Sequence, residues 1–225
     1  ISDDKIKNTA NLFIEKSDNG YKLNSLDNVL NKLNFTDKEK ERVNDYIDQL
    51  KYFGLTPYRL KEDSKYTKFI EEIKDEAIKN YKEYKILPSI TIAQAILESS
   101  WGESDLAQIY NNLFGIKADS SWKGEYVTLE TFEFYDTKIE DKFRVYSNKN
   151  QSIKDHAKFL VDNQRYKKYG VFEAKTYIEQ AYALQNAGYS TAEDNSGQKR
   201  YAKDLIELIR QYNLQLIDSE IKISD

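Results

Sequence analysis

The chain has 225 residues, of which 40% are hydrophobic and 32% charged, and its formal net charge is −4. A chain of this length can bury one good core, or one core with a small appendage. The net negative charge argues against a nucleic-acid partner, because nucleic-acid binders neutralise phosphates with lysine and arginine. No stretch of the sequence approaches the roughly 20 apolar residues of a membrane span, and no signal-peptide pattern is present.

Cysteine is absent, and His156 is the only histidine. The sequence therefore has no disulfide, no thiol nucleophile and no zinc–thiolate site, and we expect neither a metal nor another cofactor. His156 falls off the apolar helical face of Ile153, Ala157, Leu160 and Val161, which predicts a position at the surface or rim. The chemistry available to the chain is mainly that of carboxylates and tyrosines.

The N-terminal part of the chain predicts short amphipathic helices. Apolar residues recur at helical spacing from Ile6 to Ile14 and again from Leu26 to Leu33. Thr36-Asp-Lys-Glu39 matches a capping box and opens a third helix. A break at Gly54-Leu-Thr-Pro57 follows, so we place a domain boundary near residue 62.

The two expected domains are an N-terminal helical subdomain at 1–62 and a second domain at 63–225. The second domain begins with a long helix whose apolar stripe runs from Ile70 to Tyr84. Three later segments have the same periodicity and predict helices near residues 151–163, 173–185 and 198–213.

The segment from Pro88 to Gly102 predicts a core helix. Proline suits the first turn of a helix, glycine suits the position just past its end, and apolar residues surround much of the circumference. Glu98 lies in the last turn, where burial and the negative end of the helix dipole both raise the pKa of its carboxyl group. A general acid at neutral pH needs that property, although a glutamate that reaches solvent or caps a neighbouring helix has the same spacing.

Residues 125–146 change to a period of two. The stretch from Tyr126 to Tyr135 is rich in β-branched and aromatic residues, and Lys142 to Tyr146 predicts a return strand. The connection from Asp136 to Asp141 is polar. We therefore expect a single β-hairpin in an otherwise helical chain.

Ile92-Ala-Gln-Ala-Ile-Leu-Glu-Ser-Ser-Trp-Gly-Glu-Ser104, followed by Asn111-Asn-Leu-Phe-Gly-Ile-Lys117, closely resembles the glucosaminidase family of peptidoglycan hydrolases, glycoside hydrolase family 73. The resemblance covers about residues 64–213, in family order, and none of it lies in the first 62 residues. It implies a mainly α, lysozyme-like α+β fold with a small β-hairpin lobe and an N-terminal helical extension. The shorter matching blocks are Thr131-Phe-Glu133, Phe143-Arg-Val-Tyr146, Gln151-Ser-Ile153, Ala187-Gly-Tyr-Ser-Thr191 and Tyr201-Ala202.

The resemblance assigns the role of catalytic acid to Glu98. Glycosidases usually need a second carboxylate, which the hairpin offers at Glu125, Glu130 or Glu133. Strand alternation puts Glu130 and Glu133 on opposite faces, and the family's Thr-x-Glu context favours Glu133, with Glu130 kept as a substrate-binding candidate. The substrate's own N-acetyl oxygen is an alternative to this carboxylate. Tyr189 matches a family tyrosine near the active centre and is expected to orient the N-acetyl group or hydrogen-bond Glu98.

Five residues near Glu98 in sequence are candidates for substrate binding. The amides of Asn111 and Asn112 can hydrogen-bond the acetamido groups of sugars, and an aromatic ring can form a sugar platform. Trp101, Phe114 and Gly115 complete this set. The alternative is that Trp101 and Phe114 are wedges in the core that fix the loop.

The resemblance implies an endo-β-N-acetylglucosaminidase, an autolysin that hydrolyses the glycan strands of bacterial peptidoglycan. The alternatives are a muramidase or lytic transglycosylase on the same scaffold, and a non-catalytic cell-wall binding module. We expect a monomer that is secreted and acts in the cell wall. Since methionine is absent, Ile1 is not a translational start, and any export signal is expected upstream of this sequence.

Overall fold

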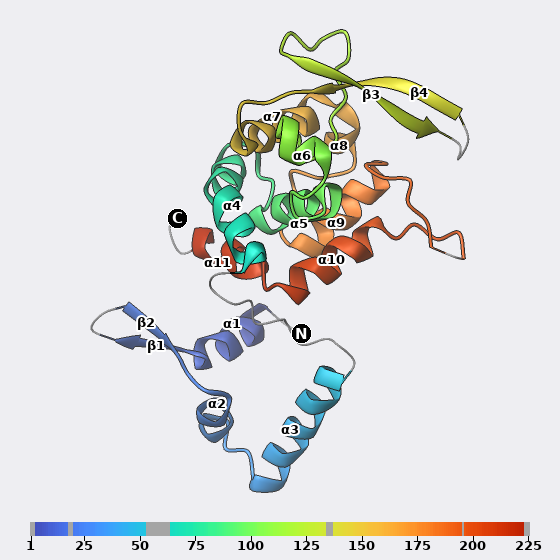
Figure 1. The fold of residues 1–225 in the computed structure, drawn as a ribbon. Coiled ribbons are helices and arrows are strands. Elements are labelled where there is room, and N and C mark those ends of the chain that lie inside the picture. The colour runs from blue at the N-terminus through green and yellow to red at the C-terminus, as the bar shows by residue number, and fades with distance from the viewer. Residues whose placement is uncertain (1–2, 18–19, 53–63, 134–136, 195, 223–225) are drawn as a thin grey trace. The chain divides into compact units, whose positions relative to one another are not determined.

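A computed structural model describes residues 3–17, 20–52, 64–133, 137–194 and 196–222. The chain divides into two compact units, Ile1–Thr56 and Pro57–Asp225 (Figure 1). Among the described residues, no helix is long and apolar enough to cross a membrane.

The first unit contains helices and a small β-hairpin. Its elements are α1 (Asp3–Leu12), β1 (Ile14–Ser17), β2 (Gly20–Leu23), α2 (Leu26–Lys32) and α3 (Asp37–Tyr52), with β1 and β2 antiparallel. The prediction of helices alone, and of a single hairpin in the chain, was therefore wrong. Ile14 begins a strand, and the sequence places an Asn-Gly pair, which favours tight hairpin turns, just after it. The capping residue Glu39 accepts hydrogen bonds from the N–H and the hydroxyl of Thr36, each at 2.8 Å.

The second unit is built around one central helix, α5, which packs against α4, α9, α10 and α11. Every residue of α5 from Pro88 to Ile96 is buried, which confirms the predicted core helix. The elements of this unit are α4 (Lys65–Tyr84), α5 (Pro88–Ser99), α6 (Asp105–Tyr110), β3 (Tyr126–Glu133), β4 (Thr137–Arg144), α7 (Lys149–Asp162), α8 (Gln164–Lys168), α9 (Tyr177–Asn186), α10 (Tyr201–Gln211) and α11 (Gln215–Lys222).

The outer helices bury the apolar stripes that the sequence predicted. In α4, Ile70, Ile73 and Ala77 are buried, and α4 packs against both α5 and α7. Asn80, also buried, donates from Nδ2 to the backbone oxygen of Ile153 at 2.8 Å and so ties α4 to α7. Figure 1 shows the β3–β4 hairpin projecting from one end of this helical body.

Several boundaries differ from the predicted ones. The helices α6, α8 and α11 were not predicted, and α9 begins at Tyr177 rather than near residue 173. The later start has a local cause, because Thr176 and Glu179 form a complete capping box there. The strand β4 begins at Thr137, so the polar segment expected as a connection pairs with β3 instead.

Candidate active site

A strained turn follows Glu98 at the end of α5. Ser100, Trp101 and Gly102 all have positive φ angles, of 50°, 65° and 74°. Residues with side chains rarely adopt this conformation, which costs of order 1–3 kcal/mol per residue and persists only where the surroundings enforce it. Here Ser99 enforces it, because its Oγ accepts a hydrogen bond from the N–H of Gly102 at 2.7 Å. The turn thereby ends α5 one residue after Glu98.

The buried hydroxyl of Tyr201 holds the carboxyl group of Glu98, and the buried amide of Gln94 holds that hydroxyl. The Tyr201 hydroxyl donates to Oε1 of Glu98 at 3.2 Å, and it accepts from Nε2 of Gln94 at 2.9 Å. Gln94 and Tyr201 are both buried, whereas the side chain of Glu98 opens into a cleft. Because the surrounding walls displace much of the water, burial raises the pKa of Glu98, and the hydrogen bond from Tyr201 lowers it to a smaller extent. The direction agrees with the one inferred from the helix pattern.

Tyr201→Phe should move the alkaline limb of the pH–rate profile upward by up to about one pH unit. The hydroxyl stabilises the charged carboxylate, so its removal raises the pKa of Glu98 further. A hydrogen bond to a charged group contributes about 1.5 kcal/mol, and one pKa unit corresponds to about 1.4 kcal/mol. The measurement is kcat/KM against pH, with the exposed Tyr182→Phe as the matched control. A limb that stays in place or moves down would contradict the assignment of this hydrogen bond.

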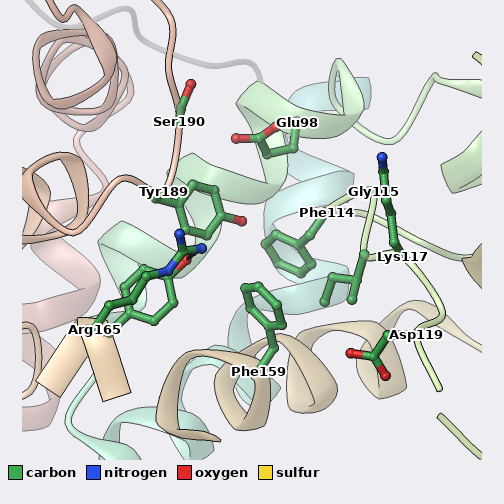
Figure 2. A pocket seen from close by; sticks show the side chains of 11 residues that line it. Glu98, Phe114, Gly115, Lys117, Asp119, Phe159, Arg165, Tyr189 and Ser190 are labelled. Atoms are coloured by element: carbon green, nitrogen blue, oxygen red, sulfur yellow. Dashed lines mark hydrogen bonds between the residues drawn. The ribbon is translucent and has the colours of Figure 1, made fainter. Parts of the chain in front are cut away.

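The cleft beside Glu98 has a volume of about 380 Å³. Figure 2 shows Glu98, Phe114 and Tyr189 around the same space, with Arg165 next to Tyr189 and Asp119 on the other side of the view. The walls come from α5, the loop after α6, the α7–α8 corner and the loop after α9. The lining residues are Glu98, Phe114, Gly115, Ile116, Lys117, Asp119, Phe159, Arg165, Tyr166, Tyr189 and Ser190.

Tyr189 lines the cleft, but the hydrogen bond to Glu98 comes from Tyr201 instead. The two tyrosine rings stack with their centroids 5.2 Å apart. The hydroxyl of Tyr189 lies 3.1 Å from Nε2 of His156. Burial and the nearby charge of Glu98 raise the pKa of Tyr189 well above its ordinary value, so this group remains a neutral hydroxyl. The sequence pointed to Tyr189, and Tyr201 lay in a matching block without being assigned a role.

The prediction that His156 lies at the surface or rim was wrong. His156 is fully buried, and its ring stacks on Phe114 with the centroids 3.8 Å apart and the planes 7° apart. Burial lowers the pKa of His156 to about 3, so the ring is neutral near pH 7. The sequence pattern of α7 indicated only one packing face. The loop that carries Phe114 covers a second face of α7, the one that holds His156.

The two asparagines are held by the backbone of their own region. Nδ2 of Asn111 donates to a backbone oxygen just after β4 at 3.0 Å. Asn112 is buried. Its Nδ2 donates to the backbone oxygen of Ile116 at 3.0 Å, and its Oδ1 accepts from the N–H of Ile116 at 3.1 Å. Both amides thus hold the loop in place, and neither residue is among the lining residues of the cleft. Phe114 and Gly115 from the same loop do line the cleft.

Trp101 lies in an aromatic cluster and not among the lining residues of the cleft. Its ring centroid is 4.5 Å from that of Tyr66, 4.7 Å from that of Tyr212 and 6.1 Å from that of Phe69. This placement fits the alternative reading of Trp101 as a wedge that fixes the turn after Glu98.

The β3–β4 hairpin keeps one register along the described length of β3. Pairing runs without interruption from Tyr126 to Glu133, so alternate residues share a face, as the sequence predicted. Leu129, on the face of Glu133, is half-buried, whereas Thr128 and Glu130 are exposed. The side chain of Glu133 lies outside the described part of the structure, and its role remains a prediction.

Sequence reasoning named no charged residue on the cleft walls besides Glu98. Lys117, Asp119 and Arg165 all line the cleft. Lys117 ends a matching block without being assigned a role, and no motif singles out Asp119 or Arg165 among 34 basic and 38 acidic residues. Within the described ranges, no group of three histidine or acidic side chains is placed to hold a metal ion.

Comparison with known proteins places residues 74–214 in a family described as glucosaminidase, mannosyl-glycoprotein endo-beta-N-acetylglucosaminidase. The chain is 44% identical over 156 residues to the exo-glucosaminidase LytG of Bacillus subtilis, a match that covers 67% of this chain and 52% of LytG. It is 43% identical over 104 residues to the peptidoglycan hydrolase FlgJ of Vibrio parahaemolyticus, covering 44% of this chain and 34% of FlgJ. The chain thus spans about half or less of these curated relatives.

Among solved structures, the catalytic domain of the autolysin Auto from Listeria monocytogenes superposes with a TM-score of 0.60 and 33% identity. That match covers 81% of this chain and 98% of the Auto domain. It confirms the mainly helical, lysozyme-like fold with a small sheet, and with the family match it identifies a glycosidase domain. The chain therefore belongs to the glucosaminidase family, glycoside hydrolase family 73.

Proposed function

We propose that this chain is an endo-β-N-acetylglucosaminidase that hydrolyses the glycan strand of bacterial peptidoglycan, as an autolysin does. The observation that carries the proposal is Glu98, a carboxyl group of raised pKa on the wall of a cleft, held by the buried hydroxyl of Tyr201. The names of the relatives, glucosaminidase and peptidoglycan hydrolase, support the same substrate.

In the proposed reaction, Glu98 donates its proton to the glycosidic oxygen as the bond to the anomeric carbon breaks. The carboxylate of Glu133, or the substrate's own acetamido oxygen, supports the positive charge that develops at that carbon. The neutral hydroxyl of Tyr189 orients the N-acetyl group from the cleft wall. Water then supplies the oxygen of the new reducing end, and the proton that it releases is taken up by a carboxylate of the site, either Glu133 or the deprotonated Glu98. No step requires a metal or another cofactor.

The test is to digest purified peptidoglycan and identify the new ends by mass spectrometry after borohydride reduction. Reduced N-acetylglucosamine ends are expected. Reduced N-acetylmuramic acid ends would show a muramidase, and 1,6-anhydro ends would show a lytic transglycosylase. Binding to the walls with no new ends would show a binding module, and each of these outcomes would overturn the proposal.

We also propose that residues 63–225 form the catalytic domain and residues 1–62 a separate, mainly helical subdomain that includes the β1–β2 hairpin. The division into two compact units supports this, as does the position of every lining residue of the cleft after residue 97. A fragment needs α11, because the carboxylate of Asp218 accepts two hydrogen bonds from Ser89 in α5. The N–H of Ser89 donates at 2.9 Å, and its hydroxyl donates at 2.6 Å.

A fragment of residues 64–225 should fold and cleave cell walls within a few-fold of the rate of the full chain. The hydrogen bond of Glu98 and all the lining residues of the cleft lie inside this fragment. The measurement is the lytic rate together with circular dichroism, and a matched fragment of 64–213 that lacks α11 should be less stable. An insoluble or unfolded 64–225 fragment would show that the two parts share a core.

We further propose that the protein is secreted and acts on the cell wall as a monomer. The cell-wall relatives support this location. Immunodetection in the wall fraction and light scattering of the purified protein test the two statements. A cytosolic protein or a stable dimer would refute them.

A further inference from the structure

Arg165, the second residue of α8, lines the same cleft as Glu98 and has no acidic partner in the described parts of the chain. Its Nη1 donates to the backbone oxygen of Gly188 at 3.3 Å, and its Nη2 donates to the hydroxyl of Tyr166 at 2.7 Å. Both acceptors are uncharged. Lys117, the other cation of the cleft wall, differs, because its Nζ lies 2.6 Å from a carboxylate oxygen of Asp141.

The contacts of Arg165 fix its guanidinium without neutralising it. The group lies over the ring of Tyr166, with Cζ 4.8 Å from the centroid, and its bond to Gly188 ties it to the segment that carries Tyr189. Arginine has five N–H donors, so further donors remain for a ligand. Figure 2 shows this guanidinium beside Tyr189 at the cleft. A fixed, charged fork of donors fits a carboxylate, which accepts two parallel hydrogen bonds.

The acidic Asp119 and the basic Arg165 lie on different sides of the cleft. Asp119 lines the cleft on the other side of the view in Figure 2. Hydrogen bonds from Ser121 lower the pKa of Asp119, so it is negative at neutral pH. A ligand carboxylate is therefore repelled near Asp119 and attracted near Arg165 and Tyr189.

If the proposed function holds, the substrate supplies such a carboxylate on only one of its two sugars. N-acetylglucosamine is uncharged. Muramic acid carries a lactyl group, whose carboxylate is either free or joined as an amide to a peptide that has carboxylates of its own. We propose that Arg165 binds a carboxylate of the muramic-acid unit and so makes the cleft select peptidoglycan over uncharged polymers of N-acetylglucosamine.

The test is a double-mutant cycle in which the guanidinium is removed from the protein and the carboxylate from the ligand, each alone and both together. The quantity measured is the dissociation constant of the glycan. The full chain carries Glu98→Gln to prevent cleavage, with or without Arg165→Met. The ligands are two soluble glycan strands, one free of peptide and one bearing it, each before and after its carboxylates are converted to amides. We expect amidation to weaken binding about tenfold when Arg165 is present and less than twofold in the Arg165→Met variant.

The two glycans distinguish the sources of the carboxylate. An effect confined to the peptide-free strand identifies the lactyl group, and an effect confined to the peptide-bearing strand identifies the peptide. Lys168→Met, on the same helix but outside the cleft, controls for the loss of one positive charge. If Arg165→Met does not fold, Arg165→Gln removes the charge and keeps an amide that can bond Gly188.

Two results would overturn the proposal while leaving the proposed function intact. Binding that does not respond to amidation would exclude a carboxylate contact. An equal loss in Arg165→Met for native and amidated strands would show that Arg165 only tethers Gly188 and Tyr166. A folded Glu98→Gln protein that binds neither glycan would instead refute the proposed function, and the inference with it.

Discussion

Glu98→Gln should leave a folded protein whose lytic rate on cell walls is lower by about 10²–10⁴-fold. General acid catalysis contributes a factor of this size, and glutamine keeps the shape of the side chain but has no acidic proton to give. The fold should survive, because Glu98 opens into the cleft, and the hydroxyl of Tyr201 can still donate to the amide oxygen. The measurement is the initial rate of turbidity loss with purified walls, with circular dichroism as the check on folding.

Glu103→Gln is the matched control for this variant. Glu103 lies five residues after Glu98 and is exposed, and it pairs with Lys65 at 2.6 Å outside the cleft. Its substitution should change the rate less than twofold. An aryl glycoside with a good leaving group gives a second check, because its departure needs little help from an acid and the loss in Glu98→Gln should then be smaller. A Glu98→Gln enzyme within a few-fold of the wild type would remove Glu98 from the mechanism.

The central helix and the environment of Glu98 could be predicted because their cause is local. Pro88 begins one helix, α5, which ends at Ser99, three residues before Gly102, and its apolar circumference requires burial. A carboxyl group in the last turn of such a helix must lie near low-dielectric walls, which raises its pKa. Each of these steps uses residues less than fifteen positions apart.

The partners of Glu98 could not be predicted, because their contacts join distant segments. Tyr201 reaches Glu98 across 103 positions of sequence. The sequence predicted His156 outside the core because it showed only one apolar stripe on α7. In the structure, Phe114 from the loop after α6 packs on a second face of α7, where His156 lies. Periodicity reports one face of one element, and it does not report which loop will cover the opposite face.

The asparagine pair shows the same limit for binding residues. The sequence does not distinguish an exposed amide from a buried one. Only the structure shows that the side-chain amide of Asn112 forms its hydrogen bonds with the backbone of Ile116. Trp101 is a similar case, because its ring packs on Tyr66 and Tyr212 instead of facing the cleft. Nearness to Glu98 in sequence therefore does not decide whether a side chain lines the cleft, as Phe114 does, or packs beside the turn, as Trp101 does.

Glu133→Gln should lower the lytic rate much more than Glu130→Gln. If Glu133 acts as base or nucleophile, the loss should be of the order of 10²-fold or more, because removing a group that acts in the transition state costs orders of magnitude. If the substrate's acetamido group does that work, the loss should be smaller but still larger than at Glu130. Glu130→Gln, on the opposite face of the same strand, is the matched control and should stay within a few-fold of the wild type.

The register of the hairpin is what separates the two outcomes. The uninterrupted pairing from Tyr126 to Glu133 keeps Glu130 and Glu133 on opposite faces, and Leu129 shows that the face of Glu133 is the more buried one. The rates of both variants are measured on the same walls, with folding checked by circular dichroism. Equal losses would contradict the assignment of Glu133. Reversed losses would mean that the hairpin turns its other face to the substrate in solution, because a shift of one residue exchanges the two faces of a strand. Glu130 would then be the carboxylate that completes the site.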